Sequence, residues 1–181
     1  MTPRTLSPVT TRVATAADAA LLASLAGTAF SDSFAADNTP ENMALYMAKS
    51  FGEEIQREEL NDPRHIVFFA EREGEVVGYA MMHDGTAPDS VASANAMEIV
   101  RFYAVKRLIG SGIGATLMQR CLDEAVSRGK NTVWLAVWSR NPRAIAFYGR
   151  WGFVNVGSQT FVLGHDRQTD DIMARRVGEE V

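Results

Sequence analysis

Residues 98–115 read EIVRFYAVKRLIGSGIGA, in which an apolar strand pattern gives way to a glycine loop that opens a helix. Three alternate glycines, Gly110, Gly112 and Gly114, let a ligand approach the backbone closely because no Cβ stands in the way. The first N–H groups of a helix have no partner inside it, and the helix dipole is positive at that end. The loop therefore predicts a site for a phosphate or pyrophosphate group. A tight turn without a ligand is the structural alternative.

The same loop fits other phosphate motifs less well. Gly110, Gly112 and Ala115 match the dinucleotide pattern G-x-G-x-x-A, which requires an acidic residue about 20 positions further on, at the end of the next strand. That strand ends at Val137-Trp138-Ser139 without a carboxylate, so a dinucleotide-dependent oxidoreductase is the least favoured function. A P-loop is excluded because no Gly-Lys-Ser/Thr sequence follows the glycines.

A second motif stands one strand later, where residues 141–153 read NPRAIAFYGRWGF. Asn141 before a proline is typical of a helix start, and Gly152 is typical of a helix end. Phe147 is expected in the core. These structural roles leave Tyr148 without an assigned function.

Together the two motifs resemble the GNAT superfamily of N-acetyltransferases. The resemblance covers roughly the C-terminal half of the chain and rests on the strand Glu98–Ala104 and on a later pattern, Asn141-x-x-Ala144-x-x-Phe147-Tyr148-x-x-x-Gly152-Phe153. Residues near both ends further resemble the PaiA-type branch, which acetylates polyamines: Phe34, Asn38, Glu41-Asn42, Gln168-Thr169-Asp170 and Ile172-Met173. The resemblance implies an enzyme that transfers an acetyl group from acetyl-CoA directly to an amine.

The resemblance also implies where acetyl-CoA binds. It places the pantetheine arm in a gap where the sheet splays, with contacts from the following residues: Phe102, Tyr103, Ala104, Ile109, Gly110, Ser111, Gly112, Ile113, Gly114, Ala115, Asn141 and Tyr148. Among them, Asn141 would bond the pantetheine and Tyr148 would lie near the sulfur. The family often has Gln or Arg where this chain has Ile109, and Arg107 is the candidate to supply the missing charge.

Amide formation requires a neutral amine, a donor for the oxyanion and a proton for the departing thiolate. Glu98 faces opposite to Met97 and Ile99 on its strand, and we expect it to act as the base through water; a surface or salt-bridged carboxylate is its alternative. A backbone amide near Tyr103 would serve the oxyanion. Tyr148 is the candidate acid because a phenol is protonated at pH 7, and a packed aromatic side chain at a helix end is its alternative.

Hydrophobic periodicity predicts the other elements. We expect strands over residues 11–13, 65–71, 75–83, 96–105, 132–138, 160–163 and 170–175, and helices over 16–29, from 40 through Tyr46 and Met47, 53–60, 112–128 and 141–151. In the first helix the predicted buried stripe is Leu21, Leu22, Leu25 and Ala29. The fold class is one α/β (α+β) domain with a central mixed, mostly antiparallel sheet and helices on both faces. Residues 1–10 are expected to form a flexible tail and residues 11–181 the acetyltransferase domain.

Composition limits the cofactors and partners. The chain has 181 residues, a net charge of −4, three histidines and one cysteine, from which we expect no metal site and no nucleic-acid partner. Cys121 falls on an apolar helix face and is expected in the core rather than as a nucleophile. No apolar run reaches the ~20 residues of a membrane span and no signal-peptide pattern precedes the domain, so we expect a cytoplasmic protein, monomeric or homodimeric, without a membrane partner.

Charge is unevenly distributed, since residues 31–62 hold eight acidic and two basic side chains. Asp32, Asp37 and Glu41 could attract a cationic substrate, although a solvated helix face is equally consistent with this charge. We therefore expect a small-molecule amine, such as a polyamine or another small cationic amine, as the acceptor. A non-catalytic acyl-CoA sensor and a peptide or protein N-terminal acetyltransferase are the alternatives.

Overall fold

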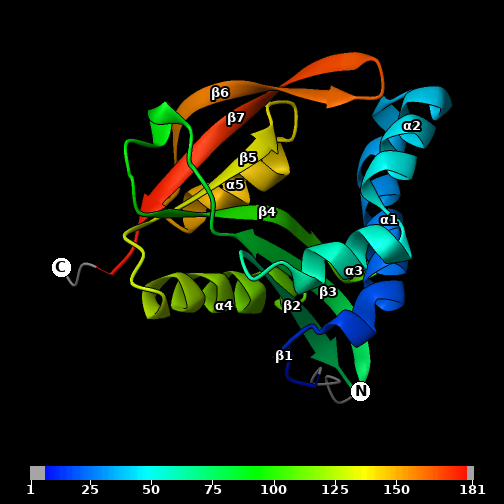
Figure 1. The fold of residues 1–181 in the computed structure, drawn as a ribbon, viewed down its shortest axis with the longest axis horizontal. Helices are drawn as coiled ribbons and strands as arrows, with labels where there is room; N and C mark the ends of the chain where they lie inside the picture. The colour runs from blue at the N-terminus through cyan, green and yellow to red at the C-terminus, as the bar shows by residue number, and fades with distance from the viewer. Residues whose placement is uncertain (1–6, 179–181) are drawn as a thin grey trace, which may run out of the picture.

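A seven-stranded sheet of order β1-β2-β3-β4-β5-β7-β6 forms the centre of the computed structural model, which describes residues 7–178 (Figure 1). Its strands are β1 Thr10–Val13, β2 His65–Arg72, β3 Glu75–His83, β4 Ala96–Ala104, β5 Thr132–Trp138, β6 Val154–Leu163 and β7 Asp166–Arg176. The helices are α1 Ala19–Phe34, α2 Pro40–Ser50, α3 Glu53–Asn61, α4 Ile113–Ser127 and α5 Pro142–Arg150. Among the described strand pairs β4–β5 alone is parallel, which confirms the predicted α/β domain on a mixed, mostly antiparallel sheet.

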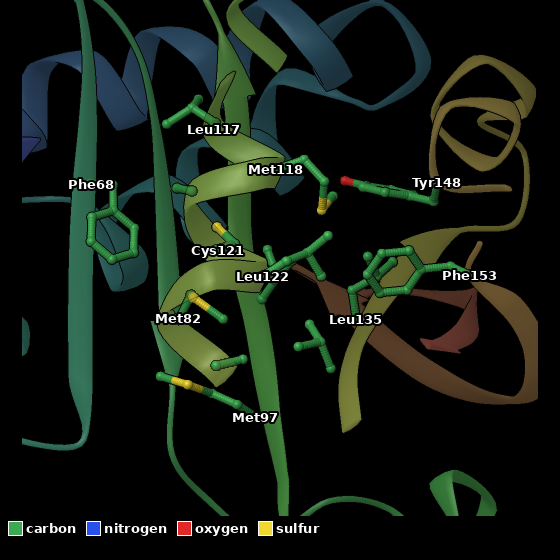
Figure 2. Packing of buried hydrophobic residues seen from close by; sticks show 14 of the residues in the cluster. Phe68, Met82, Met97, Leu117, Met118, Cys121, Leu122, Leu135, Tyr148 and Phe153 are labelled. Carbon is green, nitrogen blue, oxygen red and sulfur yellow. The ribbon is translucent and has the colours of Figure 1, made fainter. Parts of the chain in front are cut away.

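Helices cover both faces of the sheet, and two cores result. On one face α4 packs over β2, β3 and β4, and Figure 2 shows Met118 of this helix directed toward Tyr148 of α5 and Leu122 toward Leu135 of β5. On the other face α1 packs Leu22 and Ala26 against alternate residues of β2 and β3. Strands buried on both sides read as continuous apolar runs, which explains why the sequence at β2 shows no alternation.

The apolar face predicted for α4 is confirmed. Cys121, which the sequence places on this face, is buried, and so are its neighbours on the same face: Ile113, Leu117, Leu122 and Ala125. Gly129, at φ +68°, follows the helix in the left-handed conformation that commonly ends one. Burial raises the pKa of the Cys121 thiol well above its usual range, so this thiol stays protonated within the core.

The first helix differs from its prediction. A short 3-10 turn, Ala16–Asp18, precedes α1, which continues past the predicted end. Leu21 is 44% exposed, whereas Leu22, Ala26 and Phe30 are buried. The placement of Leu21 in the buried stripe is therefore wrong, because the buried face follows the ridge of every fourth residue that starts at Leu22.

By length and composition, residues 16–37 form one helical stretch that could cross a membrane, although the sequence predicts no span. This is weak evidence, because 33% of the stretch is buried and core helices of globular proteins pass the same test. The Leu22 face of this stretch packs on the sheet as such a core helix does.

The two ends of the chain depart from the predicted boundaries in different ways. β6 and β7 are longer than predicted because they pair with each other as a hairpin from Val154–Ala174 to Leu163–Asp166. In β6 the alternation is hidden because Val154 and Val162 are exposed whereas the polar Gln159 lines the groove. The predicted flexible tail lies partly outside the described residues. Of the part described, Ser7 donates a hydrogen bond to Glu73 at 2.8 Å and Thr10 begins β1.

The sheet opens between β4 and β5. These strands pair only over four residues each, Ala96–Ile99 with Thr132–Leu135. Beyond that point β4 stays paired with β3 through a bulge at Val100, while β5 stays paired with β7. The facing edges of β4 and β5 therefore have backbone polar groups without a partner strand, and such groups require water or a ligand.

Candidate active site

A groove of about 780 Å³ occupies the opening between β4 and β5. On the α4 side its wall, which we call the loop half, consists of Phe102, Ala104, Gly110, Gly112, Gly114, Ala115, Asn141, Phe147 and Tyr148. On the α1 side its wall, which we call the aromatic half, contains Phe30, Phe34, Tyr46, Phe51 and Phe161. The groove thus passes through the sheet and connects two chemically different surfaces.

The glycine loop provides the backbone donors of the loop half. Gly110 and Gly112 have φ values of +89° and +91°, which L side chains rarely adopt. The first bond of α4 runs from Thr116 N–H to Gly112 O at 3.1 Å, so the preceding N–H groups have no acceptor inside the helix. This arrangement suits an anionic group.

Most predicted contact residues line the groove, but two do not. The lining includes Tyr103, Ile109 and the glycines, whereas Ile113 is buried in the α4 core and Ser111 points behind the loop. Arg107, the predicted source of charge, is largely exposed and lies 3.8 Å from Glu75.

Asn141 and Tyr148 stand at the two ends of α5. The Asn141 side chain accepts a hydrogen bond from Ala144 N–H at 3.1 Å, which confirms the predicted helix start. The Tyr148 ring packs between Phe102 and Phe147, with its oxygen end directed toward Met118 (Figure 2). Phe147 is partly buried, packs against the core beneath α4 as predicted, and also lines the groove. Burial raises the pKa of Tyr148 above its usual value and keeps the phenol protonated.

Glu98 lines the groove at the point where the strands part. It faces opposite to Met97 and Ile99, as the strand period predicts, and lies level with Trp134 of β5. Among the described residues, no side chain forms an ion pair or hydrogen bond with its carboxylate. Burial raises the pKa of Glu98 to about 7, so the group can exchange a proton near neutral pH.

Asp170 is a second carboxylate in the groove, and the sequence argument did not assign it a role in the site. It is 8% exposed, and burial together with the nearby Asp171 raises its pKa to about 6. Within residues 7–178 no hydrogen bond or ion pair to its side chain is found. The signal in the sequence is alternation, because Asp170 shares a strand face with the buried Ile172 and Ala174.

The acidic segment lies elsewhere than expected. Asp32 and Asp37 line a smaller hollow of about 220 Å³ together with cationic side chains such as Lys106 and Arg143. Glu41 is exposed on α2 and lies outside both hollows. Glu98 and Asp170, rather than these residues, are the carboxylates of the large groove.

Aromatic rings and an anchored arginine complete the α1 side. Phe30 stacks on Tyr46 with ring centroids 4.5 Å apart, and Tyr46 meets Phe161 at 5.3 Å. Arg101 of β4 donates two hydrogen bonds to the Glu59 carboxylate, at 2.8 and 2.9 Å. Because Glu59 neutralises the charge of Arg101, the carboxylates of Glu98 and Asp170 determine the charge on the aromatic half of the groove.

Comparisons with known proteins agree with this geometry. Residues 29–153 match the model of the Acetyltransferase (GNAT) family. An uncharacterized N-acetyltransferase from Lactobacillus delbrueckii subsp. lactis is 33% identical over 146 residues, which is 81% of this chain and 84% of that protein.

Solved structures show the same fold. The PaiA N-acetyltransferase from Thermoplasma acidophilum in complex with coenzyme A superposes with a TM-score of 0.75 at 17% identity, over 93% of this chain and 99% of that one. A ribosomal-protein-alanine N-acetyltransferase from Brucella melitensis gives 0.72 at 24% identity, over 93% and 99%. At these identities the two structures establish the fold and do not select an acceptor.

Proposed function

This chain belongs to the GNAT family and is an acetyl-CoA-dependent N-acetyltransferase, and we propose that it acetylates a small amine that carries a second cationic group, as polyamines do. The observation that carries the proposal is the pair of unpaired carboxylates, Glu98 and Asp170, in one groove. Buried carboxylates without partners are costly, and such groups concentrate at functional sites.

The loop half fits acetyl-CoA. Its free N–H groups at the start of α4 suit the pyrophosphate, and the unpaired edges of β4 and β5 suit the amides of the pantetheine arm. The acetyl thioester supplies the activated acyl group when it is bound. We propose that those predicted residues of β4 and the glycine loop that line the groove, together with Asn141 and Tyr148, make these contacts.

In the proposed reaction, Glu98 accepts the proton that the acceptor ammonium must lose before its nitrogen can attack. The neutral nitrogen then attacks the thioester carbon to form the C–N bond, and an amide near Tyr103 stabilises the tetrahedral oxyanion. As the C–S bond breaks, the second proton of the nitrogen passes through water to the departing thiolate, which leaves as the thiol. Tyr148 donates a hydrogen bond to the departing sulfur. Because an ordinary thiol has a pKa of about 8.5, below that of a buried phenol, Tyr148 stabilises the thiolate rather than transferring its proton completely.

Asp170 lies too far from Glu98 to serve the same nitrogen. Glu98 is level with Trp134 and Asp170 with Trp138, four positions further along β5, which corresponds to about 13 Å along that strand. A chain of methylenes between two amines would pack against the aromatic half, where ring faces also favour ammonium groups. We therefore assign Asp170 to the distal cation.

Replacing Asp170 by asparagine should raise the KM for spermidine about tenfold and leave the KM for an alkyl monoamine of similar length unchanged, because only spermidine has a cation to lose. Steady-state kinetics with both amines measures the difference. Asp171→Asn is the matched control, since Asp171 is adjacent in the strand but faces the opposite side of the sheet. An equal change for both amines contradicts the assignment.

Thiol release from acetyl-CoA tests the reaction itself, over spermidine, spermine, small diamines, amino acids and short peptides. Tyr148→Phe should reduce turnover about 100-fold while acetyl-CoA still binds. Tyr79→Phe is the control, because this buried hydroxyl has no partner within the described part of the chain. Bound acetyl-CoA without turnover on any amine favours the sensor, and turnover on peptides alone favours an N-terminal acetyltransferase.

We also propose that residues 11–181 act as the transferase domain and that the enzyme works in the cytoplasm.

A further inference from the structure

Arg72, at the end of β2, contacts the glycine loop from behind. Its Nη2 donates a hydrogen bond to the Ser111 carbonyl oxygen at 2.7 Å, and its Nη1 donates to Ser111 Oγ at 3.1 Å. Within the loop, the Ser111 N–H and hydroxyl both donate to the Leu108 carbonyl, at 3.1 and 2.7 Å. Every polar atom of Ser111 therefore has a partner, so rotation of its peptide would break several hydrogen bonds.

This clamp determines the direction of the next backbone donor. The carbonyl of Ser111 and the N–H of Gly112 belong to one planar trans peptide, so they point in opposite directions. Because the carbonyl points to Arg72, the Gly112 N–H points away from Arg72. Gly112 lines the groove, and its φ of +91° is one that glycine adopts without strain.

We infer that Arg72 is a positioning residue that holds the Ser111–Gly112 peptide with its N–H toward the groove, where that N–H binds a phosphate group. The inference rests on the proposed function, which assigns the loop half to the pyrophosphate of acetyl-CoA. Without Arg72 the peptide can turn, and the partial negative charge of its carbonyl would then oppose the phosphates. A lysine at this position has a single point of attachment and cannot reproduce the two-pronged contact.

The test compares acetyl-CoA with S-acetyl-pantetheine, which carries the same thioester but no pyrophosphate. In Arg72→Gln we expect the KM for acetyl-CoA to rise about tenfold, with kcat and the KM for S-acetyl-pantetheine unchanged. Arg72→Lys should show a smaller rise in the KM for acetyl-CoA. Arg64→Gln is the matched control, because it removes an exposed cation that pairs with Asp62 and lies outside the groove.

Two results overturn the inference. An equal rise in KM for both thioesters in folded Arg72→Gln and Arg72→Lys would show a general structural role. An equal effect of Arg64→Gln on the KM for acetyl-CoA would show that any loss of positive charge has the same result. Calorimetry of CoA binding and of pantetheine binding to the same variants tests the role of Arg72 even if the wild type transfers no acetyl group. The role of Arg72 predicts weaker binding of CoA and unchanged binding of pantetheine. Absence of turnover with intact CoA binding would thus reject the proposed function alone.

Discussion

Replacing Glu98 by glutamine should lower kcat about 1000-fold. The amide preserves the size and polarity of the side chain, but it cannot accept the proton that the acceptor ammonium must lose. Because burial raises the pKa of Glu98 to about 7, wild-type activity should increase as the pH rises through about 7. The pH profile of kcat measures this rise in activity with pH. The rise should be absent from the residual activity of the variant.

Glu58→Gln is the control for this experiment. Glu58 is an exposed carboxylate on α3, outside the groove, and its replacement should preserve both the rate and the profile. If the Glu98→Gln enzyme keeps the wild-type kcat and the same rise of kcat with pH, another group or a water chain is the base.

The Glu98→Gln substitution should also stabilise the fold at alkaline pH. The folded carboxyl keeps its proton up to about pH 7, whereas the unfolded chain releases it near the ordinary pKa of 4.5. Unfolding therefore releases a proton in this window, and wild-type stability falls as the pH rises through it. Urea unfolding should find the variant more stable than the wild type at about pH 8 and equal to it at about pH 4.

Replacing Glu59 by alanine should lower the free energy of unfolding by about 3 kcal/mol. The substitution leaves the Arg101 guanidinium, whose side chain is 14% exposed, without its two hydrogen bonds to the carboxylate. The guanidinium lies 5.2 Å from the centre of the Phe51 ring, and this cation–π contact does not replace the lost bonds. Denaturant unfolding measures the loss, and the uncompensated cation should also weaken binding of cationic acceptors.

Glu53→Ala provides the comparison within the same helix. Glu53 pairs with Arg57 on the exposed surface of α3, and its loss should change stability by less than about 0.5 kcal/mol. The double variant Glu59→Leu/Arg101→Leu should recover much of the stability, because it removes both charges from the buried site. Equal losses in the free energy of unfolding for the Glu59 and Glu53 variants would show that burial does not determine the cost of breaking these ion pairs.

Features that depend on neighbouring residues were predicted well from the sequence. The glycine loop, the face of α4 and the cap at Asn141 follow from backbone preference and helical period, which are properties of short segments. The direction of Glu98 followed in the same way from the strand period. The boundaries of β6 and β7 were predicted less well, since exposed Val154 and Val162 and the groove-facing Gln159 hide the alternation of β6.

Contacts between distant segments were not predicted. Arg72 and Ser111 are 39 positions apart, and they meet because β2 ends behind the glycine loop, whereas the nearby Arg107 points to solvent. Asp170 faces the groove because β7 pairs with β5 at Trp138. Asp32 and Asp37, which the charge pattern favoured, line the smaller hollow instead.

The sequence by itself determined the α/β class and the glycine loop, because both depend on residues spaced by the period of a helix or strand or by the geometry of a turn. Its two motifs also resemble the GNAT family to which the chain belongs. Only the tertiary structure decided which charges enter the groove. That choice depends on strand register and on the four-residue limit of the β4–β5 pairing. Register fixes which face a side chain occupies, and it is set by contacts across the whole sheet rather than by local sequence.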